Sequence, residues 1–203
     1  MKTEKLCQVL FRLHPLPEKL KDRALQEELR AQVNGMVAGS HYVHRQLLLS
    51  AGQPAEHAYF VVEGFARGYY YDEQTGREIT LFLWGESAVA LAANSFFLRQ
   101  PSDIYMEVMP GSALLSLSHG QLARIYELFP ATEALAHLLT LQYNAFHKQR
   151  TKDLLTRSAW ERYLDLLQAH PRIEQKVSKE VIASYLGVTP QSLSRLLREN
   201  GHP

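Results

Sequence analysis

Hydrophobic and polar residues follow three successive patterns along the chain. Helical spacing is predicted from Leu16 to Val37, after Pro15 and Pro17. The middle of the chain has strand-like composition punctuated by glycine, and helical spacing returns from Gln121. Strands grouped before helices indicate an α+β protein rather than an alternating α/β protein.

The middle of the chain predicts a small β-barrel or β-roll. The segment from His57 to Asp72 is rich in β-branched and aromatic residues around two glycines. The sequence from Asp72 to Gly76 predicts a hairpin turn into the next strand. A further pair of strands is predicted from Ile104 to Ser118, where a Pro-Gly pair marks the reversal.

A long amphipathic helix is predicted from about Ala131 to Asp153. One of its faces collects Leu135, Leu138, Leu139, Gln142 and Phe146. This face can cover the open side of the roll, but the helix is longer than that task requires, which favours a seam between two chains. A further helix from Leu154 to Ala169, stopped by Pro171, is expected to brace the C-terminal segment.

The segment from Ser178 to Asn200 predicts two short helices joined by a tight turn. The first helix has an apolar face of Ile182, Ala183 and Leu186, and the facing stripe is Val188, Leu193 and Leu196. Gly187 can adopt the positive φ of a sharp turn, and Thr189 and Pro190 suit the N-cap and the first helical position. This pattern predicts a helix-turn-helix, the alternative being a solvated helical hairpin.

The second of these helices is expected to present polar side chains outward, and these are Gln191, Ser192, Ser194, Arg195 and Arg198. Glutamine can bond adenine bidentately and arginine can bond guanine, so Gln191 and Arg195 are the candidate base-reading residues. Lys179 and Arg198 are candidate phosphate contacts. The hydroxyl of Thr189 is expected to cap its own helix, with its backbone facing a phosphate.

Charge and composition narrow the functional classes. Residues 1–147 carry 12 basic and 15 acidic side chains, and the remainder carries 10 and 6, so the C-terminal quarter is basic. The chain has a single cysteine, Cys7, which excludes an intrachain disulfide. No apolar run predicts a membrane span or a secretory signal, so a cytoplasmic location is expected. No enzyme motif is present, and only His41 and His44 lie at close ligand spacing, so neither a cofactor nor a metal is expected.

The order of these parts resembles the CRP/FNR family of bacterial transcription regulators. The resemblance covers nearly the whole chain and rests on Gly52, the run from Tyr59 to Gly64 with Arg67, the pair Gly85 and Glu86, and the motif from Leu186 to Arg195. It implies a roll of the cyclic-nucleotide-binding kind, a dimerisation helix and a DNA-binding helix-turn-helix.

The resemblance also implies where a cyclic nucleotide would bind. In the family a glycine and a glutamate precede an arginine and a hydroxyl residue, and Gly85 and Glu86 match the first two. Alignment back from Ala113 places Ser102 and Asp103 where the last two should stand, which removes a charge-assisted contact to the phosphate. Arg99 would restore the site if the loop were displaced by three residues.

The segment from Asn94 to Ser118 instead resembles a short branch of the family that lacks this arginine and ends soon after the recognition helix. The last residues, from Asn200 to Pro203, leave no room for the wing strands of other members. The chain is therefore expected to rely on its recognition helix and on dimerisation for affinity.

The sequence thus predicts a homodimeric, sequence-specific transcription regulator that does not respond to cyclic AMP. Its expected parts are a sensor roll (1–120), a dimerisation helix (121–153) and a DNA-binding domain (154–203). Candidate partners are double-stranded DNA, a second copy of the chain, an unknown small-molecule effector and RNA polymerase. Candidate residues for an effector are Trp84, Gly85, Glu86 and Tyr105. The alternative is a ligand-binding or protein-interaction roll whose helix-turn-helix no longer binds DNA.

Overall fold

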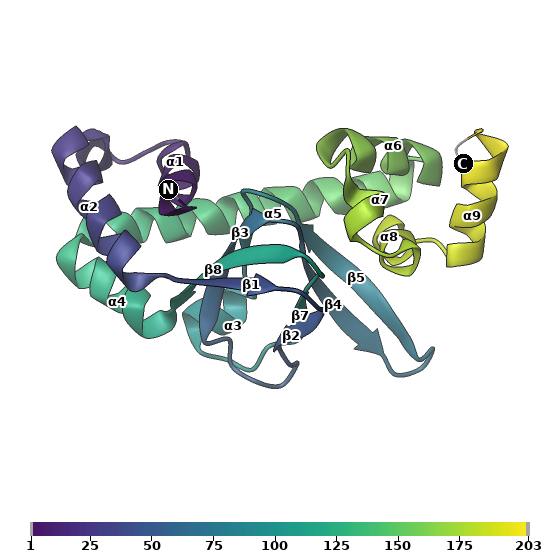
Figure 1. The fold of residues 1–203 in the computed structure, drawn as a ribbon, viewed down its shortest axis with the longest axis horizontal. Helices are drawn as coiled ribbons and strands as arrows, with labels where there is room; N and C mark the ends of the chain where they lie inside the picture. Colours follow the sequence, from purple (N-terminus) through teal and green to yellow (C-terminus); the bar gives the residue numbers. More distant parts are fainter. Residues whose placement is uncertain (1, 202–203) are drawn as a thin grey trace.

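The computed structural model describes residues 2–201, so His202 and Pro203, which belong to the expected wingless end, lie outside the described residues. Two antiparallel sheets form the centre of the molecule, with helices at both ends (Figure 1). About 52% of the chain is helical. This mixed architecture confirms the α+β prediction.

The two sheets have four strands each. The first has the order β1 (Ala38–Tyr42), β8 (Ser112–Ser118), β3 (His57–Glu63), β6 (Val89–Ala90). The second has the order β2 (Gln46–Leu49), β7 (Tyr105–Val108), β4 (Ala66–Asp72), β5 (Arg77–Trp84). The predicted hairpin joins β4 to β5, where Asp72 accepts from the N–H of Gln74 at 3.1 Å and Gly76 has a φ of +66°.

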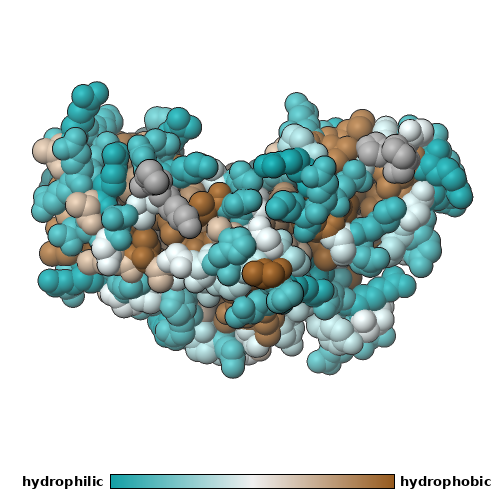
Figure 2. Space-filling model, in the orientation of Figure 1, coloured by the Kyte–Doolittle hydropathy of each residue, from teal (hydrophilic) through white to brown (hydrophobic). Residues whose placement is uncertain are grey.

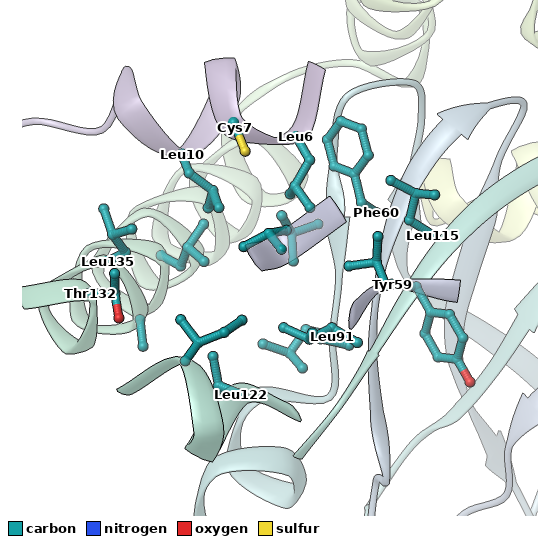
Figure 3. Close-up of a pocket in the computed structure, with 18 of the residues that line it drawn as sticks. Leu6, Cys7, Leu10, Tyr59, Phe60, Leu91, Leu115, Leu122, Thr132 and Leu135 are labelled. Atoms are coloured by element: carbon teal, nitrogen blue, oxygen red, sulfur yellow. The ribbon is translucent and has the colours of Figure 1, made fainter. Parts of the chain in front are cut away.

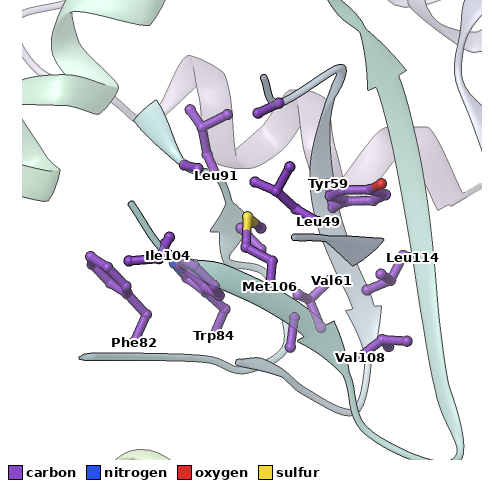
Figure 4. Close-up of a cluster of buried hydrophobic side chains, with 14 of the residues drawn as sticks. Leu49, Tyr59, Val61, Phe82, Trp84, Leu91, Ile104, Met106, Val108 and Leu114 are labelled. Carbon is purple, nitrogen blue, oxygen red and sulfur yellow. The ribbon is translucent and has the colours of Figure 1, made fainter. Parts of the chain in front are cut away.

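Side chains from both sheets fill the interior of the roll (Figure 4). Tyr59, Val61 and Leu114 come from the first sheet, and they meet Met106 and Trp84 from the second. All five are at least nine-tenths buried. Burial of each large apolar side chain contributes about 1.5 to 3 kcal/mol to stability.

The N-terminal region is more helical than the sequence indicates. The predicted helix from Leu16 to Val37 is divided into a 3₁₀ turn, η1 (Glu18–Lys21), and α2 (Arg23–Met36). The division occurs because Asp22 accepts from the N–H of Ala24 at 3.0 Å and starts a new helix. A further helix that the sequence analysis missed, α1 (Lys2–Phe11), packs with α2 over the outer face of the first sheet.

The long predicted helix is α5 (Glu133–Thr156), preceded by α3 (Ala93–Leu98), α4 (His119–Leu128) and a 3₁₀ turn, η2 (Pro130–Thr132). Its predicted apolar face is buried near the start of the helix and exposed further along. Leu135 and Leu138 are buried inside the molecule, against Leu13 and Leu20. Phe146 of the predicted face is 44% exposed, and Leu141 and Leu155, which lie outside that face, are 50% and 81% exposed.

The C-terminal region contains α6 (Ala159–Ala169), α7 (Ile173–Lys176), α8 (Lys179–Leu186) and α9 (Pro190–Glu199). The brace predicted from Leu154 begins later, because Ser158 and Glu161 form a capping box that starts α6 at Ala159. None of the helices in the described part of the chain is long and apolar enough to cross a membrane.

Candidate nucleic-acid interface

The helix-turn-helix is built by local capping. Ser178 caps α8 by accepting from the N–H of Val181 at 3.4 Å. Gly187 ends α8 with a φ of +70°. Glycine adopts this left-handed conformation at a lower free-energy cost than residues with a Cβ atom. Thr189 then caps α9 by accepting from the N–H of Ser192 at 3.1 Å, with Pro190 at the first helical position. The predicted turn and cap are therefore confirmed.

A shared apolar core fixes the angle between α8 and α9. Ile182, Ala183 and Leu186 are buried on α8, as predicted. On α9 the buried residues are Leu193 and Leu197, whereas the predicted Leu196 is only partly buried. Ala183 is fully buried, and its small side chain suits a close approach of helices.

The opposite face of α9 is exposed and polar. Gln191, Ser194, Arg195 and Arg198 are all exposed. The Nε of Arg195 lies 3.8 Å from Oε1 of Glu199, and both side chains are about two-thirds exposed. An exposed pair of this kind contributes little to stability, so Arg195 can leave Glu199 for another acceptor at small cost. In the view of Figure 2 the residues at the right-hand edge, over α9, are hydrophilic.

The structure divides the predicted reading residues into two groups. The hydroxyl of Thr189 donates to that of Ser192 at 2.9 Å, and Ser194 donates to the carbonyl of Pro190 at 2.9 Å. These three hydroxyls serve the first turns of α9 itself. Gln191, Arg195 and Arg198 remain turned outward, and Lys179 is exposed on the first turn of α8.

The helix-turn-helix is docked on the roll. Phe65, Leu83 and Met109 of the roll share one buried cluster with α6, α7, α8 and α9. Ser184 on α8 bonds the backbone of β5, and Arg162 donates to the carbonyl of Leu186 at 2.8 Å. The sequence analysis did not predict the contact between Ser184 and β5, because nothing in the sequence distinguishes Ser184 from other serines on a helix surface.

Arg150 of α5 also holds α8 in place. Its guanidinium donates to the carbonyl of Tyr185 and lies 3.8 Å from the centre of that tyrosine ring. A cation over an aromatic face is attracted by the ring quadrupole. The orientation of α8 is therefore coupled to the position of α5.

A groove of about 930 Å³ separates the N-terminal end of α9 from the roll. Arg45 and Arg77 of the roll line one side, and Ser178 and Gln191 line the other. Arg67 lies beneath, 1% exposed, with Nη1 2.6 Å from Glu78 and 3.0 Å from Glu107. Glu78 and Glu180 line the groove as well, and Arg45 is paired with Glu78 and Glu107, so the lining carries charges of both signs.

Three of the four residues expected to bind an effector, which are Trp84, Gly85 and Glu86, line one pocket of about 330 Å³ between β5 and α5, and Tyr105 lies outside it. Trp84 is buried and stacks on Phe82, with 4.9 Å between ring centroids, whereas Tyr105 stacks on Tyr69. Gly85 lies against His170. The side chain of Glu86 is 48% exposed, and its Oε1 lies 3.7 Å from Nη2 of Arg172 in the C-terminal region.

The residues that the family resemblance implies for phosphate binding do not form a phosphate site. Ser102 is buried and donates to the carbonyl of Ile104 at 2.8 Å, and Asp103 is exposed. Arg99 does not restore the site, because its guanidinium bonds the carbonyl of Ala55 at 2.9 Å and the carboxylate of Glu56. In the described residues, no group of three or more metal-ligating side chains lies together.

No family model matches the chain, and no curated protein matches it. Among solved structures, the c-di-GMP-responsive global regulator CLP of Xanthomonas campestris superposes with a TM-score of 0.66 at 15% identity, covering 86% of this chain and 91% of that one.

Two further solved structures are similar. FixK2 of Bradyrhizobium japonicum has a TM-score of 0.66 at 19% identity and covers 82% of this chain and 86% of its own. A putative CRP/FNR-family transcriptional regulator from Eubacterium rectale has a TM-score of 0.67 at 18% identity, with coverages of 85% and 82%. The chain therefore has the fold of the CRP/FNR regulators.

Proposed function

We propose that the chain is a sequence-specific DNA-binding transcription regulator that acts as a homodimer. The observation that carries this proposal is the exposed polar face of α9, in a helix whose other face is fixed in a buried core. A fixed helix can present side chains to base edges in the major groove with a defined register.

Within this proposal, Gln191 and Arg195 read bases. Both are exposed, and neither side chain caps α9. A bidentate contact from either residue would contribute about 1 to 3 kcal/mol of discrimination between base pairs. Lys179 and Arg198 contact phosphates, and the first turn of α9, beginning at Thr189, offers backbone N–H groups to another phosphate.

Dimerisation is proposed through the face of α5 opposite the roll. Leu141, Ala145 and Leu155 are exposed there, and Leu141 and Leu155 are separated by two heptads. Lys148 and Lys152 lie between them on the same face. Pairing of two α5 helices would bury the leucines while the long lysine side chains extend to solvent.

A cyclic nucleotide is not proposed as the effector. Phe82 stacks on Tyr143 of α5 with 4.8 Å between ring centroids, and His147 packs on the same ring at 4.5 Å. These rings pack α5 against β5 of the roll. The buried arginine of the roll, Arg67, is already paired with Glu78 and Glu107, so it is not free to bond a cyclic phosphodiester.

Selection of genomic DNA fragments by the purified protein tests the proposal. The bound fragments are sequenced, and the mass of the free protein is measured by sedimentation. The expected result is a palindromic motif, with half-sites about 34 to 36 Å apart, bound by a protein of twice the chain mass. A monomeric mass together with no enriched motif would contradict it. Leu141→Glu is expected to yield the monomer, and Leu164→Glu, which alters an exposed leucine on α6, is the matched control.

A further inference from the structure

A cavity lies outside the roll, between the N-terminal helices and the first sheet (Figure 3). Its volume is about 110 Å³. Leu6 and Leu10 of α1 enter from one side, Phe60 and Leu115 from the sheet, and Leu135 from α5. Tyr59, Leu91 and Phe96 of the roll core also border this cavity, and none of the predicted effector residues lines it.

The lining of this cavity carries no charged side chain. Its residues with polar atoms are Cys7, Tyr59, Tyr126 and Thr132. The hydroxyl of Thr132 already donates to the carbonyl of Phe129 at 2.7 Å. Burial raises the pKa of the Cys7 thiol and raises the pKa of Tyr126 to about 12, so both groups stay neutral at pH 7.

A cavity of this kind does not suit water. A buried water requires two to four polar partners, whereas this lining consists almost entirely of aliphatic and aromatic groups. An apolar cavity of about 150 Å³ stays dry and binds benzene. Size and lining together select a compact apolar molecule and reject ions, nucleotides and sugars.

We propose that this cavity is a binding site for a compact, uncharged, apolar small molecule, such as a single aromatic ring or a short alkyl chain. Such a molecule would contact Leu135, Ala136 and Leu139 in the first turns of α5. The other end of α5 carries Arg150, which holds α8. The helices α1 and α2, which contribute to the cavity lining, lie at the opposite end of the molecule from α9, and α5 runs between them (Figure 1).

An effect of this ligand on DNA binding would rest on the proposed function, but ligand binding does not. Binding is therefore measured on the full chain without DNA, with benzene as the probe. Thermal unfolding is followed as the benzene concentration rises. At a hundredfold excess over Kd, a single site on the native state is expected to raise the Tm by about 5 to 10 °C.

The variant Ala136→Leu fills the cavity and is expected to lose this rise. Its control is Ala31→Leu, the same change at an exposed position of α2 outside the lining, which is expected to keep it. A wild-type protein whose Tm does not rise with benzene would overturn the proposal. An equal rise in wild type and Ala136→Leu would overturn it as well.

A second measurement needs no variant of the cavity. Benzene is expected to shift the methyl resonances of Leu135, which lines the cavity, and to leave those of Leu164 unchanged. Leu164 is a fair control, since it lies on α6, outside both the cavity lining and the proposed dimer face, and is 44% exposed. Shifts at Leu164 alone, or shifts at neither residue, would show that the cavity does not bind the probe.

Discussion

The hydroxyl of Ser184 accepts a hydrogen bond from the backbone N–H of Thr80 across 2.8 Å. The same hydroxyl donates to the carbonyl of Glu78 at 2.9 Å. Because β5 is the last strand of its sheet, these backbone groups have no neighbouring strand to bond. Ser184 of the helix-turn-helix therefore supplies hydrogen-bond partners for two backbone groups at the open edge of β5.

Replacement of Ser184 by Ala is expected to lower the free energy of unfolding by about 1 to 3 kcal/mol, since the buried N–H of Thr80 would lose its acceptor. Urea unfolding measures this loss, and faster hydrogen exchange at Thr80 locates it. Ser194→Ala is the control, because that hydroxyl bonds only its own helix, and a change within about 0.5 kcal/mol is expected. Equal effects of the two changes would mean that Ser184 does not hold the interface.

Replacement of Arg67 by Ala is expected to destabilise the fold by about 3 to 5 kcal/mol. Arg67 and Glu107 are almost fully buried, with 2% and 4% of their side chains exposed, so the change leaves a buried carboxylate with weaker compensation. Urea unfolding again gives the value. A loss under 1 kcal/mol would show that Arg45, whose Nε lies 2.7 Å from Glu107, neutralises this carboxylate alone.

Replacement of Gly85 by Ala is expected to cost about 1 to 3 kcal/mol by overpacking. The added Cβ would lie 2.4 Å from Cε1 of His170, whose ring is packed edge-on against Phe65. Gly120 lies in the first turn of α4, and a Cβ added there would have no atom of another part of the chain within 4 Å. Gly120→Ala is therefore expected to be neutral or to stabilise the fold by up to about 1 kcal/mol. Calorimetric unfolding of both variants checks the contrast, and a neutral Gly85→Ala would mean that His170 moves aside freely.

The contact at His170 is expected to weaken in mild acid. Burial lowers the pKa of His170 below its ordinary 6.5, and the Glu86 carboxylate offsets this only in part. The unfolded chain therefore binds more protons than the folded one as the pH falls through 6.5, and the unfolding free energy declines. Arg172, close to Glu86, and the ring of Phe65 are the other groups at this site.

The variant His170→Gln tests this linkage. Its unfolding free energy, measured from pH 7.5 to pH 5, is expected to fall less steeply than that of the wild type. Burial also lowers the pKa of His147, so the slope does not vanish in the variant. Parallel pH curves for the two proteins would contradict a role for His170.

Sequence periodicity predicted the elements whose signals are local. Gly187 and Thr189 fix the turn between α8 and α9 by their own backbone and side-chain preferences, and the hairpin at Asp72 has the same character. Contacts between elements that lie far apart in the sequence were harder to predict. The apolar face with Leu135 and Leu138 suits either a partner chain or the N-terminal helices, and only the fold shows that it meets the latter.

In the candidate functional site, too, local features could be predicted from the sequence and long-range contacts could not. The outward face of α9 was predictable because a buried stripe at helical spacing fixes the opposite face. Among the predicted effector residues, Trp84, Gly85 and Glu86 line one pocket because they are consecutive at the end of β5, whereas Tyr105 lies on β7 and stacks on Tyr69. The docking of α8 on β5 joins residues more than one hundred positions apart and leaves no local pattern.

The most direct test of the account measures DNA affinity by fluorescence anisotropy, at one fixed salt concentration, for wild type, Arg195→Ala and Arg124→Ala. The duplexes are the selected palindrome and a scrambled duplex of equal length. Arg124 is a matched control, since it is exposed and pairs with Glu127 of its own helix as Arg195 pairs with Glu199.

Arg195→Ala is expected to weaken binding to the palindrome by about 1 to 3 kcal/mol per half-site and to lower the protein's preference for the palindrome over the scrambled duplex. Arg124→Ala should bind the palindrome as tightly as the wild type. Equal affinity and equal preference in all three proteins would contradict the claim that α9 reads DNA sequence.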